Sequence, residues 1–220
     1  VRMLVLTPTR ELADQIDQNV QAYIKNLPLR HTVLFGGVNI DKQTADLRAG
    51  CEIVVATVGR LLDHVKQKNI NLNKVEIVVL DEADRMLDMG FIDDIRKIMQ
   101  MLPKQRQTLL FSATFAPPIR KLAKDFMNAP EIVEVAAQNT TSANVEQHII
   151  AVDALKKRNL LERLIVDLQM NQVIVFCKTK QSVDQVTRDL VRRNLAAQSI
   201  HGDKSQQSRL ETLNAFKEGS

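Results

Sequence analysis

Residues 75–84 read VEIVVLDEAD, and this run limits the folds open to the chain more than any other stretch. A mainly apolar, β-branched run of this length suits a strand buried on both faces of a parallel sheet. The acids that follow it then fall at the carboxyl end of the strand, where open α/β sheets bind ligands. The run therefore predicts an interior strand with an acidic site at its end.

The composition allows such a sheet and favours an anionic partner. The 220 residues are 45% hydrophobic and 25% charged, which is typical of a globular protein of one large or two ordinary domains. The formal charge is +4 and the pI is about 9.1. Residues 1–136 carry 18 basic and 17 acidic residues (+1), whereas residues 137–220 carry 12 and 9 (+3). Most of the positive surplus therefore lies in the second part.

Cysteine content and hydropathy indicate a compartment. Cys51 and Cys177 lie next to apolar strand-like runs and lack the spacing of metal ligands, so we expect buried thiols in a reducing compartment. No apolar run approaches the roughly 18 residues of a membrane span, and the start does not resemble a signal peptide. We expect a cytoplasmic protein with no membrane contact.

Candidate strands alternate with amphipathic helices along the chain, which predicts βαβ units and therefore an α/β fold with parallel sheets. A first domain over residues 1–135 has candidate strands at 3–6, 32–35, 53–56, 75–80, 108–112 and 132–135. The small, polar segment 136–147 reads as a linker. A second domain over 148–220 has candidate strands at 149–152, 173–176 and 197–200, and helices at 155–168, 183–193 and from 205 onward.

Both ends of the chain look interrupted. Val1 enters a strand directly, and the chain stops just after Gly219, a residue type that commonly ends a helix. We therefore expect a fragment in which each domain is incomplete.

The acids Asp81, Glu82 and Asp84 are candidate catalytic residues. A carboxylate directly after a buried strand can hold Mg²⁺ through water, and a neighbouring carboxylate can polarise an attacking water. The alternative is that the acids only begin a helix, where the positive end of the dipole favours them. Ser112 and Thr114 follow another strand and offer hydroxyl groups to Asp84, unless they only form a turn and cap before a helix.

Three further junctions after strands are candidate phosphate-binding sites. In the first, Thr7 is a plausible helix cap with Pro8 at the first helical position, and Arg10 adds a charged fork. The others are Gly36-Gly37 and the Thr57-Val58-Gly59-Arg60 segment. Together they offer amides, hydroxyls and two arginines to a phosphodiester backbone, although any one alone is more often a turn.

The second part of the chain offers two basic junctions, CKTK at 177–180 and HGDKSQQSR at 201–209, whose alternative reading is solvated surface charge. Aromatic residues make up 4% of the chain, so a base-stacking platform is not expected. No histidine lies near Asp81 to complete a metal-only hydrolase, and we expect His64 and His201 at the surface or at hinges. The seven glycines do not form G-x-x-x-x-G-K-[ST], so these residues do not cradle a nucleotide's phosphates unaided.

The motifs as a set resemble one family. PTRELA at 8–13, GG at 36–37, TVGR at 57–60, DEAD at 81–84, SAT at 112–114, VIVFCKTK at 173–180 and HGDKSQQSR at 201–209 closely resemble the DEAD-box ATP-dependent RNA helicases. The intervening sequence resembles bacterial members, and we expect the branch that acts with ribosome-assembly or RNA-decay proteins. The resemblance implies two RecA-like domains of the P-loop NTPase type, which close on ATP and RNA.

The resemblance also implies roles for single residues. Asp81 would coordinate Mg²⁺ through water, Glu82 would activate the hydrolytic water, and Asp84 with Ser112 and Thr114 would couple hydrolysis to strand separation. The implied contacts to the RNA backbone, which are independent of base sequence, come from Pro8, Thr9, Arg10, Gly37, Thr57, Gly59 and Arg60 in the first domain and from Thr179, Asp203, Gln206 and Arg209 in the second.

The sequence departs from the family pattern in two ways. Val58 replaces the usual proline of T-P-G-R, for which we expect a minor effect. The family's adenine-reading glutamine segment and phosphate loop are not among these 220 residues, and neither are the later motifs with the arginine finger. We therefore expect this chain by itself not to hydrolyse ATP at a meaningful rate. A DNA-directed helicase or translocase and a non-enzymatic RNA clamp or scaffold are the alternative functions.

Overall fold

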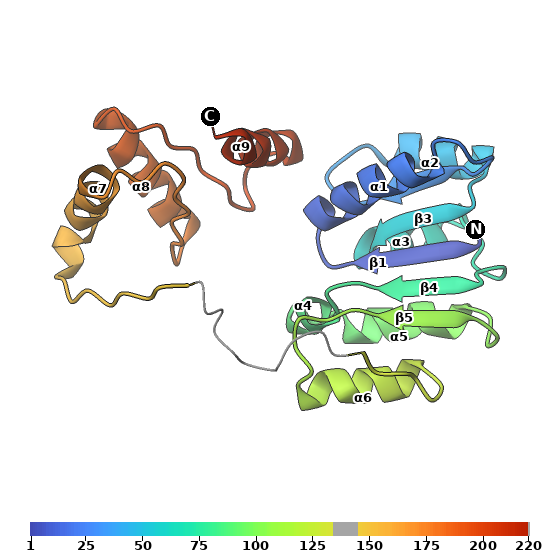
Figure 1. Cartoon of the computed structure of the whole chain (residues 1–220). Helices are drawn as coiled ribbons and strands as arrows, with labels where there is room; N and C mark the ends of the chain where they lie inside the picture. The colour runs from blue at the N-terminus through green and yellow to red at the C-terminus, as the bar shows by residue number, and fades with distance from the viewer. Residues whose placement is uncertain (134–144, 220) are drawn as a thin grey trace. The chain divides into compact units, whose positions relative to one another are not determined.

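The chain forms two compact units, residues 1–140 and 141–220 (Figure 1). The structure, a computed structural model, describes residues 1–133 and 145–219. The predicted linker 136–147 lies outside the described residues except for 145–147, which have no regular structure. Its role as a linker therefore stays a prediction.

Unit 1 is built on a parallel sheet of five strands in the order β2-β3-β1-β4-β5. Leu6 pairs with Ala56 on one side and with Leu80 on the other, so β1 and β4 are interior strands. The predicted strand at 132–135 is wrong for residues 132 and 133, and the other two residues lie outside the described ranges. The remaining five predictions are confirmed within two residues at each end, with strands β1 (Met3–Thr7), β2 (His31–Leu34), β3 (Ile53–Thr57), β4 (Ile77–Leu80) and β5 (Gln107–Leu110).

Helices cover both faces of this sheet because alternate strand residues point to opposite sides. Leu4 and Leu6 are fully buried in a large core with residues of α3, α5 and α6, whereas Val5 packs with Ala13 of α1 on the other face. This double burial makes the sheet a rigid base for the loops at its edge. The helices of unit 1 are α1 (Arg10–Ile24), α2 (Ile40–Ala49), α3 (Val58–Lys66), α4 (Ala83–Asp88), α5 (Ile92–Met101) and α6 (Pro117–Phe126).

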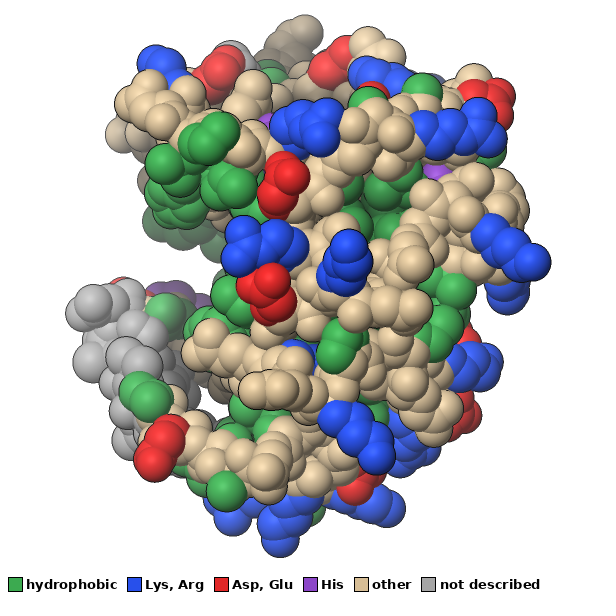
Figure 2. Space-filling model, turned by 90° about the vertical axis from the view of Figure 1, so that its right-hand side faces the viewer, with side chains coloured by type: hydrophobic (Ala, Val, Ile, Leu, Met, Phe, Trp, Pro, Cys, Tyr) green, Lys and Arg blue, Asp and Glu red, His purple; other side chains and the backbone are tan. Residues whose placement is uncertain are grey.

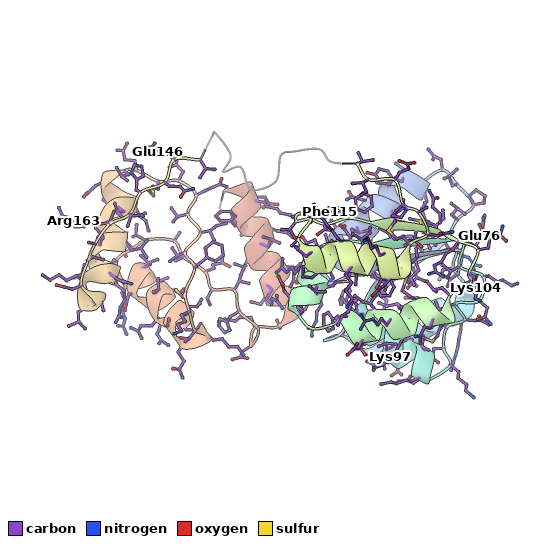
Figure 3. The ribbon with its side chains drawn as sticks, turned by 90° about the horizontal axis from the view of Figure 1, so that it is seen from below. Glu76, Lys97, Lys104, Phe115, Glu146 and Arg163 are labelled. Carbon is purple, nitrogen blue, oxygen red and sulfur yellow. The ribbon has the colours of Figure 1, made fainter. Side chains whose placement is uncertain are left out.

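The two ends of the strands carry different chemistry. Glu76, just before β4, and Phe115, which follows β5, lie at opposite ends of unit 1 (Figure 3). Figure 2 looks onto the amino-terminal ends, where basic and acidic side chains are interspersed, and where Arg2 pairs with Glu76 at 2.9 Å. The amino-terminal side is thus mixed in charge, and the predicted site residues lie at the carboxyl ends.

Unit 2 consists of helices joined by extended segments. These are the 3₁₀ turn η1 (Ala154–Lys156), α7 (Lys157–Asp167), α8 (Lys180–Arg192) and α9 (Gln206–Glu218), which confirm the predicted helices. The predicted strands at 149–152, 173–176 and 197–200 are wrong here, since residues 145–219 contain no strand. These segments form no ladder, and an isolated strand leaves its backbone groups and apolar side chains unpaired. Ile149 is 100% exposed and Phe176 is 93% exposed.

Polar contacts join the helices of unit 2. Arg158 donates to Asp189 at 2.6 Å, and this hydrogen bond between α7 and α8 holds the pKa of the Asp189 carboxyl below its usual value. Asp184 of α8 accepts hydrogen bonds from Ser199 and His201, so it fixes the segment that precedes α9.

The structure also describes the helix lengths and the two thiols. No helix among residues 1–133 and 145–219 is long and apolar enough to cross a membrane. Cys51 and Cys177 are both free thiols; Cys51 is buried as expected and its burial raises its pKa, whereas Cys177 is only partly buried, so that expectation is wrong for Cys177.

Candidate functional site

The acidic run after β4 is tied to both neighbouring strands. The amide of Asp81 donates to the Leu6 carbonyl of β1 at 3.0 Å, and the amide of Ala83 donates to Phe111, just after β5, at 2.9 Å. These bonds hold the acids at the carboxyl end of an interior strand. This is the position that the sequence predicts for a ligand site.

Glu82 has an unusual backbone conformation. Its φ of 50° and ψ of 52° lie in the left-handed region, which residues other than glycine seldom adopt. Its Oε2 is buried without a hydrogen bond and lies 3.5 Å from Nη1 of Arg85. The carboxylate is thus held by an ion pair and not by a hydrogen bond, and a non-glycine residue in a strained backbone conformation is a feature of functional sites.

Asp84 joins the acidic run to the segment after β5. Its Oδ2 accepts a hydrogen bond from the amide of Thr114 at 3.0 Å, and that amide also lies 3.4 Å from Oγ of Ser112. The sequence predicts contacts from the two hydroxyl groups, whereas the structure makes this one through the backbone. This hydrogen bond therefore couples the position of the acidic run to that of the segment after β5.

The acidic residues fit a hydrated Mg²⁺ better than a fully protein-bound metal. Oδ1 of Asp81 accepts the Glu82 amide at 2.9 Å, which leaves Oδ2 for a water of the ion. Across the described parts of the chain, no three His, Cys, Asp or Glu residues form a metal-binding group. Mg²⁺ keeps several waters and shares its ligands with substrate phosphates, so one or two carboxylates suffice.

At the first candidate phosphate-binding junction, the helix begins later than predicted. Thr9, not Thr7, caps α1, because its Oγ1 accepts the Leu12 amide at 3.4 Å and the helix begins at Arg10. Thr7 remains in β1, where it pairs with Thr57 of β3, so the chain is still extended at that point. Pro8 therefore precedes the helix and does not lie in its first turn.

Arg10 brings the first and second junctions together. A Cβ atom at Gly37 would overlap the Arg10 guanidinium, and the φ of Gly37 is +83°. Only glycine allows both this backbone conformation and this close approach. The PTR and GG motifs therefore meet at one edge of the sheet.

The third junction contacts the second. Thr57 donates through its hydroxyl to the Leu34 carbonyl at 3.4 Å, and Arg60 donates to the Val38 carbonyl from Nη1 at 3.3 Å. Gly59 is exposed in the first turn of α3, with open space where a side chain would lie. Val58, which stands where the family usually has proline, is fully buried in the core, so α3 begins without that proline.

In unit 2, the predicted RNA-binding residues lie at helix starts and in the loop before α9. Thr179 caps α8 by accepting the Ser182 amide at 3.1 Å. Asp203 accepts from Nζ of Lys180, and this hydrogen bond holds the pKa of Asp203 below its usual value. Gln206 is the buried first residue of α9, and Arg209 follows one turn later.

Sequence reasoning missed a buried part of the site. His64, expected at the surface or at a hinge, is fully buried, and Gln43 is 5% exposed. The two side chains lie 3.2 Å apart, with Arg60 bonded to the same Gln43 oxygen. A signal was present, because Gln43 stands three residues after Ile40 and four before Leu47, on an apolar helical face.

The fold and the site together define a class. A parallel sheet with acids after an interior strand and candidate phosphate-binding turns at the same edge is the arrangement of a RecA-like nucleotide-dependent motor. Residues 1–122 match the DEAD/DEAH box helicase family, and residues 156–220 match the helicase conserved C-terminal domain. The chain belongs to the DEAD/DEAH box helicase family.

Named relatives cover the whole chain. It is 42% identical over 220 residues to the ATP-dependent RNA helicase CshA of Listeria monocytogenes, and 44% identical over 221 residues to the DEAD-box ATP-dependent RNA helicase CshA of Geobacillus kaustophilus. These matches cover all of this chain, but they cover only 42% of the length of the first relative and 47% of the length of the second. The chain thus spans less than half the length of these curated relatives.

A solved structure supports the same fold. The crystal structure of a DEAD box protein from the hyperthermophile Methanococcus jannaschii matches 99% of this chain and 58% of its own, with a TM-score of 0.58 and 36% identity. The predicted RecA-like α/β fold is therefore confirmed, although the strands predicted for unit 2 are not formed in this chain.

Proposed function

We propose that the full-length protein is an ATP-dependent RNA helicase, which opens short RNA duplexes when two RecA-like domains close on ATP and on the RNA backbone. The observation that carries the proposal is the hydrogen bond from the Thr114 amide to Asp84. It links the acids suited to hydrolysis with a second segment on the edge that also presents Arg10 and Arg60. The names of the relatives support the same activity.

The acids divide the work of phosphoryl transfer. Glu82 orients the attacking water and accepts its proton, while Asp81 is the residue that would hold Mg²⁺ through water. When bound, Mg²⁺ neutralises charge that develops on the phosphate oxygens. Asp84 transmits the change to the segment at Ser112 and Thr114. The 220 residues contain no phosphate-loop sequence, so the nucleotide phosphates need donors from elsewhere in the full-length protein.

RNA is held through its phosphates and sugars and not through its bases. Amides and side chains at strand ends suit a regular backbone, and the scarcity of aromatic residues disfavours base stacking. Domain closure then bends one strand, and hydrolysis releases it. The contacts are assigned to Pro8, Thr9, Arg10, Gly37, Thr57, Gly59 and Arg60 in unit 1, and to Thr179, Asp203, Gln206 and Arg209 in unit 2.

The surroundings of the protein follow from the same assignment. We place it in the cytoplasm, which the two free thiols support. Proteins of ribosome assembly or RNA decay are the partners we expect, because the sequence resembles bacterial helicases.

The test is Glu82→Gln in the full-length protein. We expect RNA-stimulated ATP hydrolysis to fall about 100-fold or more, because the amide cannot accept the proton of the attacking water. Glu131→Gln, at an exposed position of unit 1, is the matched control and should keep the rate. Phosphate release is measured with RNA and with DNA of equal length.

The outcomes separate the alternatives. A non-enzymatic clamp would show no RNA-stimulated ATP hydrolysis to lose, and its RNA binding would not depend on ATP. Equal stimulation by DNA and RNA would favour the DNA-directed helicase. Either result contradicts the proposed function.

A further inference from the structure

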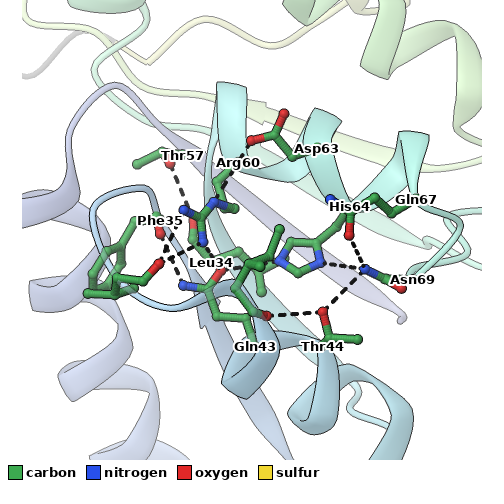
Figure 4. A network of polar contacts seen from close by, with 12 residues as sticks. Leu34, Phe35, Gln43, Thr44, Thr57, Arg60, Asp63, His64, Gln67 and Asn69 are labelled. Carbon is green, nitrogen blue, oxygen red and sulfur yellow. Dashed lines mark hydrogen bonds and ion pairs between the residues drawn. The ribbon is translucent and has the colours of Figure 1, made fainter.

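A buried polar network lies behind the phosphate-binding edge of unit 1, between α2 and α3 (Figure 4). Its centre is the side chains of Gln43 and His64, which are 5% and 0% exposed. A buried amide and a buried imidazole are costly unless each polar atom has a partner. Here all four side-chain nitrogen and oxygen atoms do, so the arrangement is tightly specified.

Gln43 connects the end of β2 to the arginine of the third junction. Its Nε2 donates to the Phe35 carbonyl at 3.0 Å, which directs its Oε1 to the opposite side. That oxygen accepts from Nη1 of Arg60 at 3.1 Å and from Nε2 of His64 at 3.2 Å. One amide group thus fixes a backbone turn and an arginine together.

His64 is held neutral and in one tautomer. To donate to Gln43, its Nε2 must carry the proton, and its Nδ1 then accepts from the Asn69 amide at 3.3 Å. Burial, reinforced by the charge of Arg60, holds the pKa of His64 below its usual value. The imidazole therefore serves as a fixed hydrogen-bond donor beside the arginine.

The network leaves part of the Arg60 guanidinium for a ligand. Three hydrogen bonds engage it, two to the Val38 carbonyl and one to Gln43, whereas its Nε lies 3.9 Å from Asp63. An arginine has five N–H donors. Among the described residues, Nε–H and one N–H of Nη2 make no hydrogen bond; Nε has only the long ion pair with Asp63, on a side chain that is 12% exposed, so these two adjacent donors are the ones left for bidentate contact to a phosphate.

We propose that Gln43 and His64 are positioning residues, which hold Arg60 and the turn at 36–38 in the orientation that binds an RNA phosphate. The inference rests on the proposed function, since it requires Arg60 to contact RNA. A fork that is already oriented loses less conformational entropy on binding, and so binds more tightly. The competing explanation is that the network only packs α2 against α3.

The experiment is a double-mutant cycle on RNA affinity in the full-length protein. The probe is a fluorescein-labelled single-stranded polyuridine RNA, with a non-hydrolysable ATP analogue present, titrated at several salt concentrations. Arg60→Ala should weaken binding about 10-fold and lower the salt slope by about one, as expected for one lost phosphate contact. Gln43→Met, which keeps the volume but not the polar atoms, should weaken binding at least threefold.

The double variant distinguishes positioning from packing. In an Arg60→Ala background, Gln43→Met should cost no further RNA affinity, because the arginine that it orients is gone. Its effect on the unfolding free energy should persist there. Gln18→Met on α1, where the glutamine bonds only Asp14 at the surface, is the matched control and should keep the affinity.

The failure modes differ. If Arg60→Ala leaves affinity unchanged, the RNA role of Arg60 in the proposed function fails. If Arg60→Ala weakens binding but folded Gln43→Met does not, or if the two effects add in full, the positioning inference is overturned and the proposed function stands. His64→Phe provides a second variant with the same expected pattern, should Gln43→Met fail to fold.

Discussion

The two units treat similar apolar runs differently. Residues 77–80 of unit 1 read IVVL and form β4, which pairs with β1 and β5. Residues 173–176 of unit 2 read VIVF but form no strand, and Phe176 is 93% exposed. An apolar run becomes a buried strand only where its neighbours satisfy the backbone on both sides.

The difference extends to the candidate site. In unit 1, Asp84, Arg10 and Arg60 are held by contacts that cross from one strand end to the next. In unit 2, Thr179 is held by the Ser182 amide of its own turn, and Asp203 by one exposed ion pair with Lys180, 23 residues earlier in the chain. A parallel sheet thus brings distant residues to one edge, whereas helix caps organise only their own turn.

The largest test of this comparison concerns the two cores. In the 220-residue chain, Leu4→Ala should destabilise unit 1 by about 2–5 kcal/mol, because it opens a cavity beneath a fully buried strand. Ile174→Ala, at a side chain that is 63% exposed, should change the stability of unit 2 by no more than about 0.5 kcal/mol. Urea unfolding followed by circular dichroism measures both. A comparable loss at Ile174 would mean that this run is packed in solution, and would break the comparison.

A smaller effect is expected at the turns. Gly37→Ala should cost about 1–2 kcal/mol, because alanine is strained at a φ of +83° and its Cβ meets Arg10. Gly202→Ala in unit 2 should be tolerated within about 0.5 kcal/mol, since its Cβ would only touch Lys180 at 3.7 Å. Thermal unfolding of the two variants gives the values. Equal costs would show that the turn of unit 1 is no more constrained than that of unit 2.

The smallest effect concerns acid stability. A hydrogen bond from the Arg30 amide lowers the pKa of Glu52 in unit 1, and one from His201 lowers the pKa of Asp184 in unit 2. A folded-state pKa below the unfolded value gives stability above the unfolded pKa, which is lost as the pH falls through the folded pKa. The ordinary pKa of a glutamate or aspartate carboxyl is about 4, so both losses occur in the acidic range below about pH 4.5.

Two substitutions measure these losses. With Glu52→Gln or Asp184→Asn, the free energy of unfolding of the unit that carries the substitution should fall less between pH 6 and pH 3 than it does in the unchanged protein. Both groups are solvent-exposed, so each change should be smaller than that of Gly37→Ala. An unchanged acid limb in both variants would show that neither hydrogen bond contributes.

Much of unit 1 was predictable from local patterns. β4 and the acids after it follow from an apolar run that ends in carboxylates, and the family is recognisable from the order of short motifs. The start of α1 was less predictable, because Thr7 and Thr9 are both residues that commonly cap helices. Thr7 is excluded as the cap only because it pairs with Thr57 and so remains part of strand β1. The burial of His64 was missed because its hydrogen-bond partner Gln43 lies 21 residues earlier in the chain, and the sequence around His64 does not indicate such a partner.

By itself the sequence determined the five strands of the sheet in unit 1, the helices, the acids after β4 and the likeness to the helicase family, because these depend on residue type and short spacing. Only the tertiary structure decided which strands pair, that the Thr114 amide and not a hydroxyl meets Asp84, and that Gln43 and His64 stand behind Arg60. The physical reason is that these contacts join residues far apart in the chain. Their geometry is set by sheet order and packing, which no short stretch of sequence encodes.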